Sequence, residues 1–285
     1  MQGRVGIVVV SYHNPETTKH YVTKELQKLV TPYTLVVVNV DSTREDSMVL
    51  AERCGLCFID NNSPVEKGSN CFLIWDKDNL GYAKGNNRGV KFLNEIGEFD
   101  YLLFSNDDIE IVSPNILEVL INRMQENEDI AAIGPRVIGK DSREQSPHDR
   151  YISPYRMIGW RLFPFLRKKR DMPETDKDAL PMSRYTYWVS GAFMLVDAVA
   201  FSKVGMFDET TFLYFEEPII AERFALIGKK MYFESTVSIV HYEGESSAKL
   251  GNKKKEYERK SRRHYLCTYK RESLLILWLY NKIEP

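Results

Sequence analysis

The sequence predicts an α/β protein built on a mixed, mostly parallel sheet that is flanked by helices. Continuous apolar runs rich in β-branched residues alternate along the chain with segments of helical period. Such runs are typical of strands that are buried on both faces. Strands that alternate with helices pair in parallel through right-handed crossovers. We therefore expect ligands to bind beyond the carboxyl ends of these strands.

Two strand–helix units open the chain. Residues 4–10 form a β-branched run that ends in the polar sequence Ser-Tyr-His-Asn-Pro at 11–15. A helical pattern follows from about residue 16 to residue 30. Residues 34–40 repeat this scheme, with polar residues 41–43 before the next helix. An apolar β-branched run followed by turn-forming residues is the pattern of a strand that enters a loop.

The third unit contains the most informative stretch of the chain. Residues 71–75 predict a short strand, and residues 79–87 predict a loop that leads into a helix up to about residue 96. The apolar run 101–104 then ends in Ser-Asn-Asp-Asp-Ile-Glu at 105–110. Carboxylates at a strand end repel one another unless they share a cation, and Mg²⁺ or Mn²⁺ suits such oxygen ligands. The alternative is a solvated acidic turn before a helix that starts at 113–114.

The second half of the chain is less regular. Residues 145–182 contain scattered prolines and charge clusters and predict a long irregular segment, either a lid or an uninvolved surface excursion. Strand character returns at 185–196, around Ser-Gly-Ala at 190–192, and a short helix follows at 197–204. Pro218 suits the first position of a helix up to residue 227. Two short strands are expected at 231–234 and 237–240.

Composition sets limits on the class of protein. A chain of 285 residues forms one large α/β domain or two small ones. The net charge of −1 gives no reason to expect nucleic acid as a partner. Four cysteines are few for this length, so we expect a reducing compartment, that is, a cytoplasmic protein with free thiols. No signal peptide is visible, and no apolar run approaches the roughly 20 residues that span a bilayer.

A set of short motifs occurs in a fixed order along residues 5–247. The motifs are Val-Ser-Tyr-His-Asn at 10–14, Asn-Leu-Gly at 79–81, Gly-Asn-Asn at 85–87, Ser-Asn-Asp-Asp at 105–108, Ser-Gly-Ala at 190–192, Gly-Met-Phe-Asp at 205–208, Tyr-Phe-Glu-Glu at 214–217 and His241. In this order they resemble the inverting glycosyltransferases of family 2, which have the GT-A fold. Each motif alone is weak, but unrelated chains seldom contain the whole set.

The resemblance implies a nucleotide-sugar site. Two residues of the first loop match the contacts to base and ribose, and the loop at 79–87 resembles the one that lies on the nucleotide. Asn39 matches an acid that usually reads the base; it is neutral here, which leaves the choice of base open, and its alternative role is that of a turn residue. The predicted nucleotide-sugar contacts are Ser11, Tyr12, Asn39, Asn79, Gly81, Asn86, Asn106, Asp107 and Gly191.

The resemblance also implies a divalent cation, Mg²⁺ or Mn²⁺. Family members carry Asp-x-Asp or Asn-x-Asp at the metal motif, and Asn106 and Asp108 match that pair. Alternate side chains of an extended chain point to the same side, so these two are expected to face the ligand while Asp107 points away. Asp108 is the predicted metal ligand. His241 matches a histidine that completes the metal site in many relatives, and its alternative role is structural.

Glu217 matches the catalytic Asp of the family and is the predicted general base, with Glu216 as the second candidate. The base would remove a proton from an acceptor hydroxyl as its oxygen attacks the anomeric carbon, which inverts the configuration. Alternatively, the two glutamates only complement the dipole at a helix N-terminus. Arg223, further along the same helix, is expected to make a supporting ion pair.

The C-terminal tail is basic and then apolar. Residues 249–272 contain ten Lys or Arg and three acids, and the apolar run 274–280 follows. The tail therefore predicts either contact with an anionic membrane or a terminal helix that packs on the domain. We expect a GT-A domain at 1–247, with a nucleotide-binding half at 1–135 and an acceptor and catalytic half at 136–247, followed by a helical tail at 248–285.

These predictions combine into one hypothesis. The chain is expected to transfer a sugar, with inversion, from dTDP-rhamnose or a UDP-sugar to a hydroxyl of a glycan or lipid-linked glycan in surface polysaccharide synthesis, in the cytoplasm at the inner face of the membrane. One alternative is a sugar nucleotidyltransferase, which would need a Gly-rich basic loop after the first strand. The other is a non-catalytic relative that binds nucleotide sugar or glycan, because Asn39, Asn106 and Glu217 depart from the family pattern.

Overall fold

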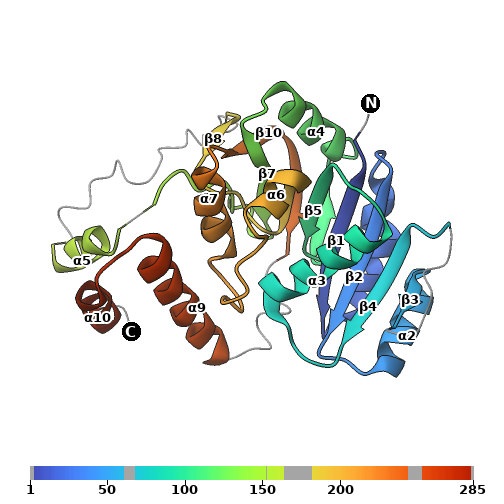
Figure 1. Ribbon diagram of the computed structural model, residues 1–285, viewed down its shortest axis with the longest axis horizontal. Helices are drawn as coiled ribbons and strands as arrows, with labels where there is room; N and C mark the ends of the chain where they lie inside the picture. The colour runs from blue at the N-terminus through green and yellow to red at the C-terminus, as the bar shows by residue number, and fades with distance from the viewer. Residues whose placement is uncertain (1–2, 61–67, 152, 164–181, 243–251, 284–285) are drawn as a thin grey trace.

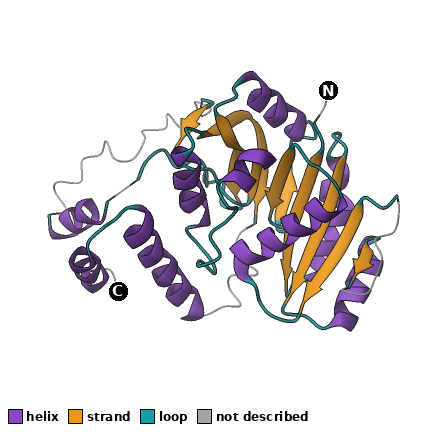
Figure 2. Cartoon of the chain, in the orientation of Figure 1, coloured by secondary structure: helices purple, strands orange, loops and turns teal. Residues whose placement is uncertain are grey.

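The computed structural model describes residues 3–60, 68–151, 153–163, 182–242 and 252–283. It confirms the predicted fold class: one mixed sheet lies between two layers of helices (Figures 1 and 2). The order of strands across the sheet is β3-β4-β2-β1-β5-β9-β7-β10-β6, and β8 pairs with β10.

The first half of the sheet is parallel. Its central strands are β1 (Val5–Tyr12), β2 (Tyr33–Val40), β4 (Cys71–Asp76) and β5 (Tyr101–Ser105), as the apolar runs predicted. The short edge strand β3 (Cys57–Ile59) also pairs in parallel, with β4, and was not predicted. Because these strands run the same way, their polar carboxyl ends meet at one edge of the sheet.

The second half of the sheet is mixed. Strand β9 (Phe193–Asp197) runs antiparallel between β5 and β7 (Ile130–Gly139). The sequence analysis did not predict β7. Strand β10 (Lys230–His241) pairs in parallel with β7 and antiparallel with β6 (Ile109–Ile111) and β8 (Arg184–Thr186).

Two predictions for this half were wrong. The residues at 231–234 and 237–240 belong to one strand, because β10 continues through an irregularity between Glu234 and Ser238 instead of breaking. Residues 190–192 form a turn at the start of β9 and not a strand. The turn leaves the backbone of Gly191 free to bond to side chains.

Helices cover both faces of the sheet. One face packs against α1 (Pro15–His20), the π-helical turn Tyr21–Glu25, the 3₁₀ turn Leu26–Lys28, α2 (Arg44–Cys54) and α4 (Ile116–Glu126). The other face packs against α3 (Gly81–Ile96), α6 (Ala198–Lys203) and α7 (Glu216–Leu226). The predicted helix at 16–30 is thus a succession of three helical types. Pro218 lies at the third position of α7 and not the first.

Residues 145–182 are not irregular throughout. Helix α5 (Pro154–Leu162) forms within them because the side chain of Ser153 accepts a hydrogen bond from the Arg156 N–H and proline suits the first helical position. Residues 164–181 lie outside the described part of the chain. The prediction that this segment forms a lid or a surface excursion falls largely on these residues.

The tail forms α9 (Asn252–His264), a π-helical turn (Tyr265–Tyr269) and α10 (Leu274–Ile283). It is joined to the domain at Asp208, which accepts hydrogen bonds from His264 Nε2 (2.8 Å) and the Tyr269 hydroxyl (2.6 Å). The expected ion pair of Arg223 is confirmed, with Asp208 as its partner at 3.3 Å. Although burial opposes ionisation, these hydrogen bonds hold the pKa of Asp208 below its ordinary value.

Helix α10 packs against α5 and lies away from the sheet (Figure 1). A hydrogen bond from the Tyr151 hydroxyl to Glu272 (3.0 Å) ties the segments before the two helices together. No helix in the described ranges is long and apolar enough to cross a bilayer.

Candidate active site

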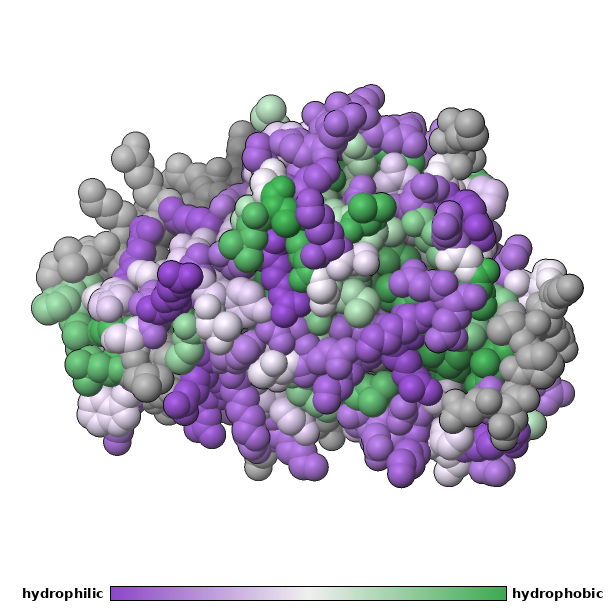
Figure 3. All heavy atoms as spheres, in the orientation of Figure 1, coloured by the Kyte–Doolittle hydropathy of each residue, from purple (hydrophilic) through white to green (hydrophobic). Residues whose placement is uncertain are grey.

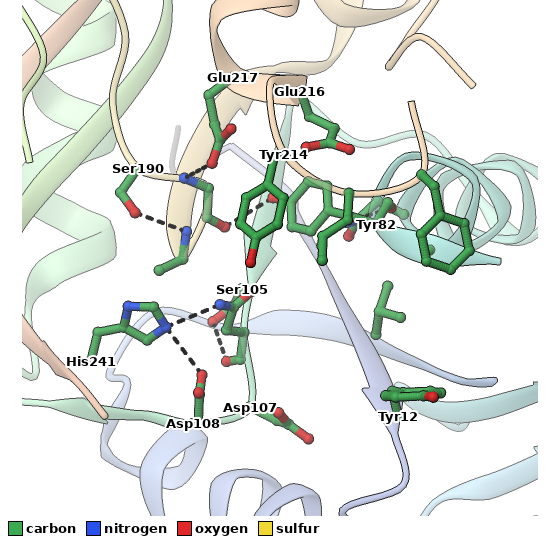
Figure 4. A pocket seen from close by; sticks show the side chains of 18 of the residues that line it. Tyr12, Tyr82, Ser105, Asp107, Asp108, Ser190, Tyr214, Glu216, Glu217 and His241 are labelled. Carbon is green, nitrogen blue, oxygen red and sulfur yellow. Dashed lines mark hydrogen bonds and ion pairs between the residues drawn. The ribbon is translucent and has the colours of Figure 1, made fainter. Parts of the chain in front are cut away.

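A cavity of about 470 Å³ opens at the carboxyl ends of β1 and β5. Its wall includes eleven of the thirteen residues that the sequence singled out. These are Tyr12, Asn79, Gly81, Asn86, Asn106, Asp107, Asp108, Gly191, Glu216, Glu217 and His241. Figure 4 shows the two glutamates at one end of the pocket, and Asp108 and His241 at the other.

Two predicted positions, Ser11 and Asn39, are not part of the pocket wall. Both are buried, and the Ser11 hydroxyl lies 2.7 Å from that of Thr18. The Asn39 amide donates to the hydroxyls of Ser42 (3.1 Å) and Ser47 (2.9 Å), which occupies both of its N–H groups. Asn39 therefore braces the loop after β2 in this structure instead of offering a donor to a base.

The loop before α3 is shaped by a close contact between two backbones. Gly81 has φ +67°, and a Cβ there would lie 2.2 Å from the carbonyl oxygen of Phe212. Only glycine tolerates both conditions. The Gly81 N–H donates to Asn79 Oδ1 (3.0 Å), and the Tyr82 N–H donates to the carbonyl oxygen of Phe212 (2.9 Å). The Asn79–Gly81 motif thus fixes the loop of Phe212, which leads to the two glutamates.

Asp108 and His241 meet because of a strand pairing. Strand β6 begins directly after Asp108 and pairs antiparallel with the end of β10, with Ile109 opposite His241. His241 Nε2 then lies 3.2 Å from Asp108 Oδ1 and 3.2 Å from the amide nitrogen of Asn106. Asn106 and Asp108 therefore lie on the same side of the chain, as their alternation predicted.

Gln145 orients the imidazole of His241 from behind. Its Oε1 lies 2.8 Å from His241 Nδ1, and because an amide oxygen only accepts, Nδ1 must carry the proton. In the neutral ring Nε2 then has a lone pair that accepts a hydrogen bond from the Asn106 amide and lies near the Asp108 carboxylate. The imidazole nitrogen and the carboxylate oxygen are both electron-pair donors, so a cation can bind to the two together. Sequence reasoning missed Gln145 because a single glutamine in an irregular segment carries no signal.

The donor atoms at this point fit a divalent cation that is shared with a substrate. Two adjacent ligands of an octahedral ion with bonds of about 2.1 Å are about 3 Å apart, close to the observed separation of Asp108 and His241. Within the described ranges no three His, Cys, Asp or Glu residues converge as a metal site. The protein would thus supply two ligands and leave the rest to water and phosphate oxygens, as Mg²⁺ sites commonly do.

Asp107 belongs to the wall of the pocket but is held from outside it. Its Oδ2 accepts a hydrogen bond of 2.6 Å from the Thr18 hydroxyl on α1, and its side chain is mostly buried. This contact links the acidic turn to the first loop, in line with the expectation that Asp107 points away from Asn106 and Asp108.

The two glutamates have different surroundings. Glu217 is half-buried, and its Oε1 accepts a hydrogen bond from the Gly191 N–H (3.1 Å). A Cβ on residue 191 would lie 2.8 Å from that oxygen, so a larger residue there would displace the carboxyl from its present position. Glu216 is buried, and its Oε1 has no hydrogen-bond partner among the described residues. Burial raises the pKa of both carboxyls, and the charge of Glu217 raises that of Glu216 further.

Tyr82, which sequence reasoning missed, completes this end of the pocket. Its hydroxyl donates to the carbonyl oxygen of Gly191 (2.9 Å), so both polar groups of that glycine are occupied. Burial, together with the nearby carboxyls of Glu217 and Glu216, raises the pKa of Tyr82 well above its ordinary value. Tyr82 therefore stays protonated and acts as a fixed donor.

The glutamates begin α7 after a strained turn. Tyr214 and Phe215 have φ of +70° and +71°, and Phe215 is the N-cap of the helix. The left-handed conformation costs a non-glycine residue roughly 1–2 kcal/mol. The π-helical turn of the tail packs on this segment, with Tyr265 and Phe215 ring centres 5.5 Å apart. The strain is therefore maintained by tertiary contacts next to the carboxyls.

Aromatic rings line the remaining wall. The rings of His148 and Trp188 stack at 3.5 Å with 10° between their planes, and both residues border the cavity together with Tyr12 and Tyr214. Such faces suit the apolar side of a sugar or a base. The arrangement thus offers two ligands for a cation, aromatic walls and a carboxyl able to accept a proton.

Comparisons with known proteins agree with this geometry. The profile described as Glycosyl transferase family 2 matches residues 6–191. An N-acetylglucosaminyl-diphospho-decaprenol L-rhamnosyltransferase of Mycobacterium tuberculosis is 25% identical over 198 residues, which cover 65% of this chain and 63% of that protein. Rhamnosyltransferase WbbL of Escherichia coli K12 is 24% identical over 192 residues, which cover 66% and 70%.

A solved structure supports the same fold at low identity. The mannosyltransferase PcManGT of Pyrobaculum calidifontis, in complex with GDP-Man and Mn²⁺, superimposes with a TM-score of 0.56 and 12% identity. The match covers 99% of this chain and 70% of that chain. The sheet described above is thus shared with a protein that binds a nucleotide sugar and a metal.

We predict that Glu216→Gln stabilises the protein at neutral and alkaline pH. A carboxyl whose pKa is raised in the folded state opposes folding once the pH exceeds its unfolded pKa of about 4.3. Each pKa unit between the folded and unfolded states lowers the free energy of unfolding by about 1.4 kcal/mol at high pH. Glutamine removes this cost, so the gain should be absent near pH 4 and grow as the pH rises. Urea unfolding of both proteins across this range measures it.

Glu209→Gln is the matched control. Hydrogen bonding to Asn87 and the charge of Lys91 lower the pKa of Glu209 in spite of its partial burial, so this variant should gain nothing as the pH rises. A Glu216→Gln protein that is no more stable than the wild type at pH 8 would contradict the assignment of Glu216 as a buried acid with a raised pKa.

Proposed function

Because the chain belongs to glycosyl transferase family 2, we propose that it transfers a hexosyl group from a nucleoside diphosphate sugar to a hydroxyl group, with inversion at the anomeric carbon. The observation that supports this most is the position of Asp108 and His241, 3.2 Å apart in the same cavity as the Glu217 carboxyl. A cation site for a diphosphate and a proton acceptor are the two requirements of such a displacement.

Asp108 and His241 would hold Mg²⁺ or Mn²⁺, with Asn106 beside them. When bound, such an ion stabilises the negative charge that develops on the diphosphate as it leaves. The mannosyltransferase of similar fold was solved with Mn²⁺ and GDP-Man, which supports this role. Tyr12, Asn79, Gly81, Asn86, Asp107 and Gly191 remain the proposed walls of the nucleotide-sugar site.

Glu217 is the proposed base. The Gly191 N–H fixes one of its oxygens and leaves the other for the acceptor hydroxyl. Its raised pKa brings the carboxylate nearer to the pH at which it works, which favours proton transfer. Glu216 differs because its unpartnered, buried oxygen favours the neutral acid. A single displacement with one base leaves the product with inverted configuration.

The donor and the acceptor are proposed from the relatives. Two similar proteins are rhamnosyltransferases, and one of them acts on a sugar linked through diphosphate to decaprenol. We propose dTDP-rhamnose or a UDP-sugar as donor and a glycan or lipid-linked glycan as acceptor, in surface polysaccharide synthesis. The family match favours this transfer over nucleotidyl transfer. A binding protein without turnover is the remaining alternative, and the loss of transfer in a base variant decides between them.

A peripheral contact with the inner face of the cell membrane completes the proposal. Helices α5 and α10 together expose apolar side chains, and Figure 3 shows them at the end of the molecule where Figure 1 places these helices. The exposed side chains are Tyr155, Leu162, Phe163, Leu275, Trp278 and Leu279. The adjoining α9 carries seven Lys or Arg and two Glu. A basic helix beside an exposed apolar patch suits an anionic lipid surface.

The first prediction concerns the metal. UDP or dTDP at about 100 times its Kd should stabilise the protein by about 2.7 kcal/mol, a rise in Tm of roughly 5–10 °C, only when Mn²⁺ is present. Asp108→Ala should remove the metal-dependent rise. Glu110→Ala, which changes the next acid of the same run, should retain it. An equal rise in Asp108→Ala, or no rise for any nucleotide in the wild type, would count against the site.

The second prediction concerns the base. Glu217→Gln should bind nucleoside diphosphate with Mn²⁺ like the wild type but transfer sugar about 10²–10⁴ times more slowly, because a general base contributes that much. Isothermal titration and a single-turnover transfer assay measure the two properties. Glu216→Gln should retain transfer. If Glu217→Gln transfers at the normal rate and Glu216→Gln does not, the base is Glu216.

The third prediction concerns the membrane. The wild type should sediment with vesicles that contain anionic phospholipid and much less with zwitterionic ones, and Leu275→Ser should weaken the binding. Leu275 is 69% exposed, and Leu226 on α7 is 84% exposed, so Leu226→Ser is the control for loss of an exposed leucine. Vesicle binding unchanged by Leu275→Ser, or a dimer in solution that Leu275→Ser dissociates, would assign the apolar surface to another use.

A further inference from the structure

The pocket is bordered by one positively charged side chain from a segment that lies outside the family match. Four carboxyl groups and a single Lys or Arg border the cavity within the described part of the chain. The carboxyls belong to Asp107, Asp108, Glu216 and Glu217, and the cation is Lys254. Lys254 lies on α9, outside residues 6–191. The tail therefore contributes a charged residue to the site.

Contacts of α9 hold Lys254 at the pocket. The ring of Tyr257 stacks on that of Phe212 at 4.2 Å, with 28° between their planes. The Ser261 hydroxyl donates to the carbonyl oxygen of Leu213 (2.9 Å). Positions 254, 257 and 261 lie on the same face of a helix, because they are three and four residues apart. The face of α9 that presents Lys254 is thus the face bound to the loop before Glu216.

Lys254 itself lies over Tyr214, with Nζ 5.7 Å from the ring centre. No carboxylate within the described ranges forms an ion pair with it, whereas Lys260 on the same helix pairs with Glu256 at 2.7 Å. Among the described residues, no carboxylate therefore neutralises the charge of Lys254. Lys254 is thus available to bind an anion that enters the cavity.

Charge balance defines what that anion is. A diphosphate carries at least two negative charges and would enter a cavity bordered by the carboxylates of Asp107, Asp108 and Glu217, so like charges oppose its binding. A divalent cation held by Asp108 and His241 would offset part of this repulsion. A lysine at the border of the same cavity is a point charge well suited to a second phosphate oxygen.

We propose that Lys254 binds a diphosphate group in this pocket, and this rests on the proposed transfer of sugar from a nucleotide. The diphosphate has two sources: the leaving group of the donor, or the diphosphate that links a glycan acceptor to lipid. In either case the tail is part of the active site, and the basic character of α9 serves substrate binding as well as any surface contact.

The test compares Lys254→Ala with Lys255→Ala. Both side chains are exposed and adjacent on α9, but only Lys254 borders the cavity. Isothermal titration measures the binding of UDP, dTDP and inorganic pyrophosphate in the presence of Mn²⁺. Initial rates measure KM for a donor sugar, for a short-chain alkyl-diphosphate glycan, and for the same glycan without diphosphate. Lys254→Arg, which keeps the charge, should behave nearly as the wild type.

The outcomes separate the two sources. If the donor supplies the diphosphate, Lys254→Ala should weaken nucleotide and pyrophosphate binding about tenfold or more. If the acceptor supplies it, nucleotide affinity should stay constant while KM rises about tenfold for the diphosphate-bearing acceptor alone. Equal values for Lys254→Ala and the wild type in every arm, or the same loss in Lys255→Ala, would overturn the proposal. A wild type that binds no nucleotide with Mn²⁺ would instead overturn the proposed function.

Discussion

The site depends on the pairing of β6 with the end of β10. This short antiparallel contact brings an acid from the middle of the chain to 3.2 Å from a histidine more than a hundred residues later. Gln145 then fixes the ring so that its lone pair faces the acid. A carboxylate oxygen and an imidazole nitrogen at this separation are two electron-pair donors that one divalent cation can bind together, and this is the physical reason to place a cation there.

The opposite end of the pocket is organised by a glycine and by the tail. Gly191 has no side chain, so the Glu217 carboxyl and the Tyr82 hydroxyl both reach its backbone. The segment before Glu216 adopts two consecutive left-handed residues and is covered by the tail. The tail is in turn joined to the domain through Asp208. The tail therefore contacts both the domain and the segment that leads into the site, although the predicted domain boundary at residue 247 separates the tail from the site.

The sequence predicted the parallel half of the sheet and most of the pocket wall, because both follow from local patterns. Continuous apolar runs identify buried strands, and polar residues at their ends point to the ligand edge. Long-range contacts were not predictable in this way. Strand β6 has three residues, and the contacts of Gln145, Tyr82 and Lys254 join segments far apart in the chain. Asn39 matched a motif position, yet its amide bonds to neighbouring serines, which only coordinates reveal.

The most direct measurement is the anomalous diffraction of Mn²⁺ in crystals grown with the metal and a nucleoside diphosphate. We expect one peak about 2–2.3 Å from both Asp108 Oδ1 and His241 Nε2, with diphosphate oxygens completing the coordination. A peak at another edge of the sheet, or a diphosphate bound without metal and away from these two side chains, would contradict the proposed cation site.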